Sequence, residues 1–190
     1  MDYKKVSVNI YDIMGDIMKG VKKGVALTTK CGERVNSMTI SWGTVGILWH
    51  KPIFTAFIRQ SRFTHKQLLA NPEFTISIPA EGAKSSAKYN NRANEILKFI
   101  GSKSGYEVDK VSALGLNLID SDEVSVPGIA DFSIVLECRV VYKQDQDKNE
   151  IPAEFMPKWY PIIKADEGTS DFHTAFIGEI LSAYYVKKEN

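Results

Sequence analysis

The sequence has few of the residues that mark a metal centre, a disulfide framework or a membrane span. Its 190 residues include two cysteines and three histidines, and neither cysteine belongs to a C-x-x-C pair. Thiols and imidazoles are too few for the usual zinc or iron ligand sets, so no metal is expected. The N-terminal residues lack the apolar core of a signal peptide, and no apolar run approaches membrane-spanning length. These absences predict a cytoplasmic protein with no membrane partner.

The sequence also lacks an excess of basic over acidic residues, or the reverse. With 24 basic and 23 acidic residues the formal net charge is +1, so no global field selects nucleic acid as a partner. The sequence contains no G-x-G-x-x-G after a strand, no G-x-S-x-G, no H-E-x-x-H and no Walker A motif. What is present, 44% hydrophobic and 25% charged residues without a linker or repeat, predicts one domain spanning residues 1–190.

Short alternating apolar runs predict a mainly β protein. Strands are expected over residues 25–29, 35–41, 53–58, 74–78, 132–142 and about 175–186, with a hairpin turn at 30–33. In the run from Phe132 to Tyr142 the even positions are apolar and the odd ones mostly polar, which predicts one buried and one wet face. Residues 8–22 and 84–100 allow helices, although each could instead be extended or a loop. This order predicts an antiparallel barrel or a closed Greek-key sheet.

One loop gathers two arginines and two hydroxyls. Arg59, Ser61, Arg62 and Thr64 lie within six residues, just before a predicted helix in which Thr64 and Gln67 have capping-box spacing. A helix N-terminus has unpaired N–H groups and a partial positive charge, and guanidinium groups are suited to phosphate. The four residues therefore predict a site for a phosphorylated small molecule. The alternative is that Thr64 only caps the helix while the arginines pair with surface carboxylates.

The predicted strand that ends at residue 41 also carries several polar side chains. By alternation Ser37, Thr39 and Ser41 share one face, and Asn36 and Met38 lie on the other. Such a row of hydroxyls can bind a polyol chain or the polar edge of a ring, or can simply face solvent at a sheet edge. Trp42 and Gly43 follow, and a large aromatic beside a glycine can form one wall of a flat pocket or can belong to the core.

Four segments in order resemble one known family. They are N-S-M-T-x-S-W-G at residues 36–43, R-x-S-R-x-T at 59–64, the segment 101–110, and the segment 173–180. Together they resemble the flavin reductase-like proteins, including the flavoredoxin branch. The resemblance implies an FMN-binding split β-barrel, an antiparallel Greek-key barrel with peripheral helices, in a homodimer. It also implies that FMN is bound by Asn36, Ser37, Met38, Thr39, Ser41, Trp42, Arg59, Ser61, Arg62 and Thr64.

The resemblance further implies an oxidoreductase that passes electrons from NAD(P)H through flavin to an acceptor. His173 matches a histidine beside the flavin and the nicotinamide, and is the catalytic candidate; a purely structural histidine is the alternative. A flavoredoxin-like electron carrier with a redox protein partner and no NAD(P)H activity would share these motifs, as would a protein whose flavin site has decayed. Two departures stand out. Family members usually have S-G-R where this chain has Ser104-Gly105-Tyr106, and residues 83–94 look expanded.

Overall fold

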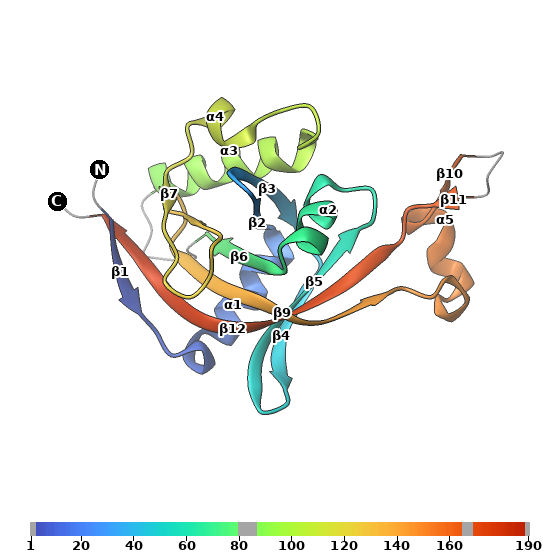
Figure 1. Ribbon diagram of the computed structural model, residues 1–190, viewed down its shortest axis with the longest axis horizontal. Helices are drawn as coiled ribbons and strands as arrows, with labels where there is room; N and C mark the ends of the chain where they lie inside the picture. The colour runs from blue at the N-terminus through green and yellow to red at the C-terminus, as the bar shows by residue number, and fades with distance from the viewer. Residues whose placement is uncertain (1–2, 80–86, 165–168, 189–190) are drawn as a thin grey trace.

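In this computed structural model the described residues are 3–79, 87–164 and 169–188, and they form a large antiparallel sheet with helices around it (Figure 1). The sheet has eight strands in the order β3-β2-β6-β9-β12-β5-β4, with β1 also paired to β12. The predicted mainly β, antiparallel architecture with peripheral helices is confirmed. The strands are β1 (Tyr3–Ser7), β2 (Val25–Cys31), β3 (Arg34–Ile40), β4 (Gly43–Leu48), β5 (Lys51–Arg59), β6 (Glu73–Ile78), β9 (Ile134–Asp145) and β12 (His173–Lys188).

The remaining elements lie around this sheet. Two short strand pairs, β7 with β8 and β10 with β11, stand apart from it. The predicted helix over part of residues 84–100 exists as α3, although residues 80–86 lie outside the described part. The bounds are α1 (Ile10–Lys23), α2 (Phe63–Ala70), α3 (Ala87–Ser102), β7 (Leu118–Ile119), α4 (Lys110–Leu114), β8 (Gly128–Ile129), η1 (Lys148–Glu150), η2 (Ala153–Phe155), α5 (Met156–Trp159), β10 (Ile162–Lys164) and β11 (Thr169–Ser170).

The segment 8–22, for which helix and extended chain were both open, is the helix α1. The side chain of Asn9 accepts a hydrogen bond from the N–H of Tyr11 and caps the start, and Gly24 ends the helix at φ 115°. The buried side chains recur at helical spacing, so one stripe of α1 packs against the sheet. The stripe consists of Ile10, Ile13, Ile17, Gly20 and Val21.

The prediction of one wet face for the strand after residue 132 is wrong. The side chains of β9 are buried on both faces from Ile134 to Cys138, and from Val141 onward the strand is exposed on both faces. The odd-numbered Glu137 is fully buried because its carboxylate accepts hydrogen bonds from the backbone N–H groups of Asp122 and Glu123. A long loop, residues 120–127, therefore covers the face that alternation had assigned to water.

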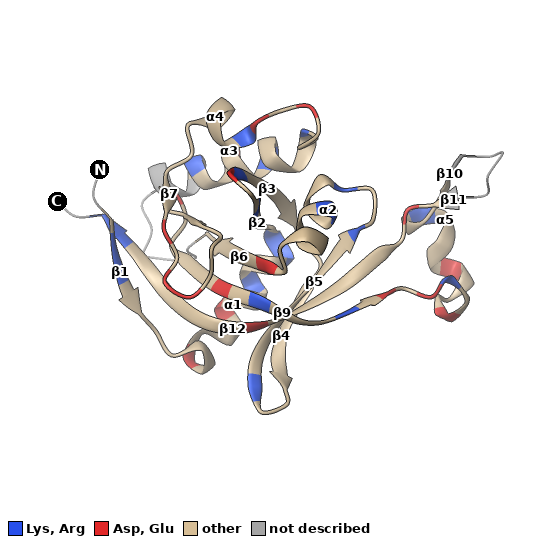
Figure 2. Ribbon diagram, viewed as in Figure 1, with Lys and Arg blue, Asp and Glu red and all other residues tan. Residues whose placement is uncertain are grey.

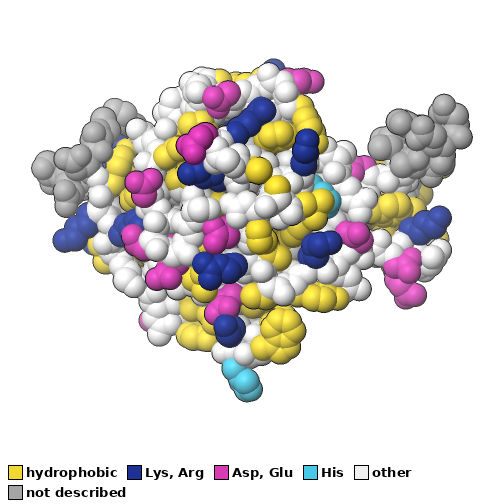
Figure 3. Space-filling view, in the orientation of Figure 1, with side chains coloured by type: hydrophobic (Ala, Val, Ile, Leu, Met, Phe, Trp, Pro, Cys, Tyr) yellow, Lys and Arg dark blue, Asp and Glu magenta, His cyan; other side chains and the backbone are white. Residues whose placement is uncertain are grey.

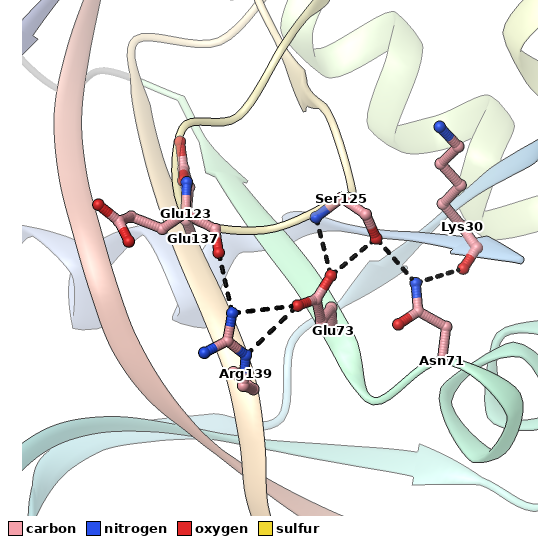
Figure 4. A network of polar contacts seen from close by, with 7 residues as sticks. All are labelled: Lys30, Asn71, Glu73, Glu123, Ser125, Glu137 and Arg139. Carbon is pink, nitrogen blue, oxygen red and sulfur yellow. Dashed lines mark hydrogen bonds and ion pairs between the residues drawn. The ribbon is translucent and has the colours of Figure 1, made fainter.

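The same loop is tied to β6 by a polar network. Glu73 accepts hydrogen bonds from the N–H and hydroxyl of Ser125 at 2.8 and 2.7 Å, and from Arg139 on β9 at 3.3 Å (Figure 4). These contacts lower the pKa of Glu73 below its ordinary value, even though partial burial acts in the opposite direction. Arg139 also donates to the carbonyl of Glu123, so the middle of the loop is fastened to both β6 and β9.

The strand β4 was missed by the sequence prediction. It pairs with β5 in a hairpin that projects from the sheet, at the bottom of Figure 1. At the tip Trp49 and His50 both have positive φ, 52° and 60°, as a two-residue hairpin turn of type I′ requires. Neither is a glycine or an asparagine, so the usual sequence signal of this turn is absent.

The two ends of the long strands differ in their surroundings. Where β6, β9 and β12 lie side by side they cover the main core, which α1 closes (Figure 1). Toward the right of the picture β9 and β12 stay paired up to Asp145 and Thr174 and are then joined by residues 146–172, here called the arm. Over the described ranges, no helix is long and apolar enough to cross a membrane.

Candidate functional site

Two adjoining pockets lie between the sheet, the helices α2–α4 and the arm. The first, the polar pocket, has a volume of about 80 Å³ and lies between β3, the start of α2, and the segment 100–110. The second, the aromatic slot, has a volume of about 210 Å³ and lies between β3, β5, Trp159 of the arm and His173. Met38, Thr39 and Arg62 line both. The two pockets therefore share one border and can receive two parts of one elongated ligand.

The residues predicted from the sequence divide between these pockets. All but Ser37 line at least one of them. The polar pocket is lined by Asn36, Met38, Thr39, Ser61, Arg62 and Thr64, and the aromatic slot by Met38, Thr39, Ser41, Trp42, Arg59, Arg62 and His173. The structure thus brings both sequence motifs and the distant histidine to one place.

The predicted capping box at the start of α2 is wrong. The N-cap residue is Arg62, whose side chain makes no capping bond. Thr64 is buried, and its hydroxyl accepts a hydrogen bond from the amide of Asn36 at 2.8 Å, which joins α2 to β3. Gln67 turns inward as well: it accepts a hydrogen bond from Thr29 and donates one to the carbonyl of Arg34. The N–H of His65 bonds to the carbonyl of Arg62, so the N–H groups of Phe63 and Thr64 are the ones that a ligand could engage at the start of α2.

The four polar residues of the predicted anion site do not all converge. Arg59 lines the slot rather than the polar pocket, and its guanidinium donates to the carbonyls of Asp171 and Trp159 at 2.7 and 2.8 Å. Ser61 donates to the carboxylate of Asp171 through its N–H at 3.0 Å and its hydroxyl at 2.6 Å. Two of the four residues therefore hold the arm against the end of β5.

Lys110 is a functional candidate that the sequence prediction missed. Its side chain is buried, lines the polar pocket, and donates to the carbonyls of Ser37 and Ile100 at 2.9 and 2.8 Å. Burial, aided by the positive charge of Arg62, lowers the pKa of Lys110 to about 8. Asp109 is the N-cap of α4, so it fixes the position of Lys110 as the first residue of that helix. The only sequence signal for Lys110 was this capping aspartate directly before a lysine.

The loop that departs from the family pattern forms the rim of the polar pocket. A Cβ on Gly105 would lie 2.5 Å from Oδ1 of Asn36, so only glycine lets this loop approach β3 so closely. Tyr106 is exposed and meets the ring of Phe63 edge-on at 5.0 Å. Arg34 supplies a guanidinium here instead, since it donates to the carbonyl of Gly105 and lies 4.4 Å from the ring of Phe63.

Aromatic rings form the walls of the slot. The ring centroids of Trp42 and His173 are 4.7 Å apart, with 33° between the planes. Trp159 from the arm meets Trp42 edge-on at 5.1 Å. Trp42 is therefore a wall of the slot, which answers the choice between wall and core that the sequence left open. Trp159 was missed because no periodic pattern runs through the arm.

His173 is buried behind the slot and is hydrogen-bonded to Gln146 and Tyr160. Its backbone N–H donates to Oε1 of Gln146 at 3.0 Å, and its Nδ1 lies 3.2 Å from the hydroxyl oxygen of Tyr160. Burial is the main cause that lowers the pKa of His173 to about 4, and the charge of Arg59 adds to it. The imidazole is therefore neutral in neutral solution.

The hydroxyl row predicted on β3 is largely engaged within the protein. Ser37 is fully buried and donates to the carbonyl of Leu27 at 3.3 Å, so its side chain lies beneath the site rather than in it. Thr39 donates to the carbonyl of Leu97 on α3. Only Ser41 is exposed. Across the described part of the chain, no cluster of histidine, cysteine and carboxylate side chains could hold a metal ion.

Comparisons with known proteins agree with this geometry. A family model described as a flavin reductase like domain matches residues 18–190. The fold is similar to an FMN-binding domain of a flavin reductases-like enzyme from Shewanella baltica, with a TM-score of 0.63 and 14% identity over 97% of this chain and 78% of that one. It is also similar to flavoredoxin of Desulfovibrio vulgaris, with a TM-score of 0.58 and 23% identity over 88% of this chain and 69% of that one. These likenesses confirm the predicted fold.

A relative in Archaeoglobus fulgidus, itself uncharacterized, is 29% identical over 152 residues, which make up 78% of this chain. The chain spans 64% of that relative's length.

Proposed function

Since the chain belongs to the flavin reductase-like family, we propose that it binds FMN and passes electrons from NAD(P)H through the flavin to an acceptor. The observation that supports this best is the shared border of the two pockets. A small cationic pocket beside a wider aromatic slot matches a molecule with a phosphate at one end and a flat ring system at the other.

The polar pocket fits a phosphate group. Arg62 and Lys110 supply positive charge, and the N–H groups of Phe63 and Thr64 at the start of α2 supply backbone donors. The close approach of Gly105 to β3 leaves backbone rather than side chains at the rim, which is where a phosphate needs donors. In the ribbon of Figure 2, Lys and Arg are interspersed with Asp and Glu along the described chain.

The aromatic slot fits the ring system. Trp42 and Trp159 offer apolar faces against which a flat ring can pack, and the backbone of β3 at Met38 and Thr39 borders it. Bound flavin would supply the hydride chemistry itself. The residues of this chain bind and orient it, exclude water from one side of the ring, and place the neutral His173 at the wall of the slot.

Absorption spectroscopy tests the proposal directly. The purified protein is titrated with FMN, and NADH or NADPH is then added under anaerobic conditions. Flavin bands that shift on binding and bleach with either nicotinamide support the full proposal. Saturated protein that never oxidises NADH or NADPH rules out the reductase part, and failure to bind FMN at micromolar concentration rules out the cofactor.

A flavoredoxin-like electron carrier is the second candidate, and the likeness to Desulfovibrio vulgaris flavoredoxin favours it. In that case a redox protein partner, rather than NAD(P)H, reduces the bound flavin. Dithionite would then bleach the flavin bands while both nicotinamides leave them unchanged.

We also propose that the protein is a homodimer, as the family resemblance implies. Large apolar side chains are exposed on the projecting β4–β5 hairpin, at Ile47 and Trp49, and on the arm, at Phe155 and Ile162. Hydrophobic and charged side chains are otherwise interspersed on the face seen in Figure 3. Sedimentation equilibrium decides the matter, because a mass of 21.3 kDa in solution would exclude a dimer.

A further inference from the structure

Gln146 and Tyr160 form a hydrogen-bonded chain with His173 behind the slot. Oε1 of Gln146 lies 3.0 Å from the backbone nitrogen of His173 and 2.9 Å from the hydroxyl oxygen of Tyr160. A backbone N–H can only donate, so the Gln146 atom that faces it must be the amide oxygen rather than the amide nitrogen. The orientation of the Gln146 amide is thereby fixed by the backbone of β12.

This orientation sets the direction of the remaining hydrogen bonds. An amide oxygen only accepts, so the hydroxyl of Tyr160 must donate its one hydrogen to Gln146. The oxygen of Tyr160 can then only accept from Nδ1 of His173, at 3.2 Å. The proton of the neutral imidazole therefore lies on Nδ1, and Nε2 carries a bare lone pair.

The environment of the ring leaves this lone pair for a ligand. His173 is only 6% exposed, and it lines the slot. Nδ1 faces Tyr160, and the ring of Trp42 covers one face. Among the hydrogen bonds made by the residues that the structure describes, none involves Nε2. Because His173 lines the slot, a donor on a bound ligand is the partner that this acceptor would meet there.

We infer that Gln146 and Tyr160 are positioning residues that hold His173 in its Nδ1–H tautomer, so that Nε2 accepts a hydrogen bond from an N–H or O–H group of the molecule in the slot. The inference rests on the proposed function in taking the slot as the site of the ring. In a flavin the matching donors are ring N–H groups. The inference also sharpens the role of His173, because an imidazole with a bare Nε2 cannot give a proton from that atom.

Nitrogen NMR of the imidazoles tests the tautomer without any ligand. In protein labelled with ¹⁵N on histidine, long-range ¹H–¹⁵N spectra at pH 7 separate protonated from bare ring nitrogens, and His173→Gln identifies the signals of His173. We expect a protonated Nδ1 and a bare Nε2. The opposite pattern in the wild-type protein would overturn the inference.

Two variants then test the positioning chain. Gln146→Leu removes the acceptor, so Tyr160 is free to donate to Nδ1 and the proton should move to Nε2. Tyr160→Phe removes the partner of Nδ1 and should give a mixture of tautomers. Tyr142→Phe is the matched control, because Tyr142 is exposed on β9 and the tautomer should not change. Variants that keep the wild-type pattern would show that Gln146 and Tyr160 have no positioning role.

The ligand part of the inference is measured separately by FMN titration. Gln146→Leu and Tyr160→Phe should weaken FMN binding by about two- to tenfold, the usual effect of one hydrogen bond. Affinity equal to that of the wild type would overturn the acceptor role of Nε2. Absence of FMN binding to the wild-type protein, with the Nδ1–H tautomer observed, would instead refute the proposed function and support the tautomer assignment.

Discussion

The polar pocket and the aromatic slot differ in which parts of the chain build them. The polar pocket is made from β3, the start of α2 and the segment 100–110, all held by the sheet and its helices. The slot takes Trp159 from the arm and His173 from the point where the arm rejoins β12. The first pocket is therefore a property of the main fold, whereas the second depends on a segment that leaves the sheet and returns.

The two pockets also differ in their titration. In the polar pocket burial lowers the pKa of Lys110 to about 8, and in the slot it lowers the pKa of His173 to about 4. At neutral pH the first group is charged and the second is neutral. Lowering the pH therefore changes the protonation of His173 in the slot, and raising it changes that of Lys110 in the polar pocket. The two pockets can thus be perturbed separately.

The largest expected effect is on the polar pocket alone. Lys110→Met should weaken FMN binding by about 10- to 100-fold, because a charge-assisted hydrogen bond to phosphate is lost. Riboflavin, which has the ring but no phosphate, serves as the control ligand in the same fluorescence titration. An equal loss for both ligands would mean that Lys110 only supports the fold through the carbonyls of Ser37 and Ile100.

The slot should dominate the response to acid. Between pH 6.5 and 4 the unfolded chain protonates His173 and the folded chain does not, so the free energy of unfolding falls as the pH is lowered through this window. We expect a loss on the order of 2 kcal/mol from this group. Urea unfolding of the wild type and of His173→Gln at pH 7 and 4.5 measures it. If the wild type and His173→Gln lose the same free energy of unfolding between pH 7 and 4.5, the loss does not come from His173.

The polar pocket should dominate the response to alkali. Phosphate favours the charged form of Lys110, so FMN affinity should decline above pH 8, by up to about tenfold per pH unit. The comparison with riboflavin, whose affinity should stay level over the same range, separates this effect from any change in the slot. Binding that is flat from pH 7 to 9.5 would place the phosphate away from Lys110.

The smallest expected effect is on the wall of the slot. Trp159→Ala should weaken FMN and riboflavin equally, by about three- to tenfold, because it removes a ring face but no charge. Lys148→Ala is the control in the same arm, because Lys148 is exposed in η1, and it should change neither affinity much. If Trp159→Ala weakened the binding of FMN but not of riboflavin, Trp159 would act on the phosphate rather than on the ring.

The sequence predicted β2, β3, β5, β6 and β12 to within a few residues, because each is a run rich in apolar and β-branched residues. For β9 it predicted the strand but not the burial of its second face, because the loop around Asp122 covers a face that alternation assigns to water. It also failed on β4, whose tip at Trp49 and His50 lacks the residues that usually mark such a turn. Both failures come from contacts or strain that no local window records.

In the candidate site, too, local motifs were predicted and contacts between distant residues were not. The contiguous motifs named most of the residues of β3 and β5 that line the pockets, though not Ile40 or Phe57, and His173 came from the family resemblance. Lys110, Gln146 and Tyr160 were missed, because their roles arise from partners between 10 and 73 residues away in the sequence. Ser37 shows the converse: alternation placed it correctly on its face, but it could not show that Leu27 already engages its hydroxyl.

The bonds from Arg59 to the arm have a consequence for how such proteins can diverge. Both of its acceptors, at Trp159 and Asp171, are backbone carbonyls, which every amino acid possesses. The bonds from Arg59 therefore do not depend on the side chains of the arm, whereas the bonds from Ser61 require Asp171. Because β9 and β12 are paired neighbours, residues can also be added between them without shifting the register of the sheet. Mutations in the arm can thus change the residues beside the slot while the main sheet and the polar pocket stay the same.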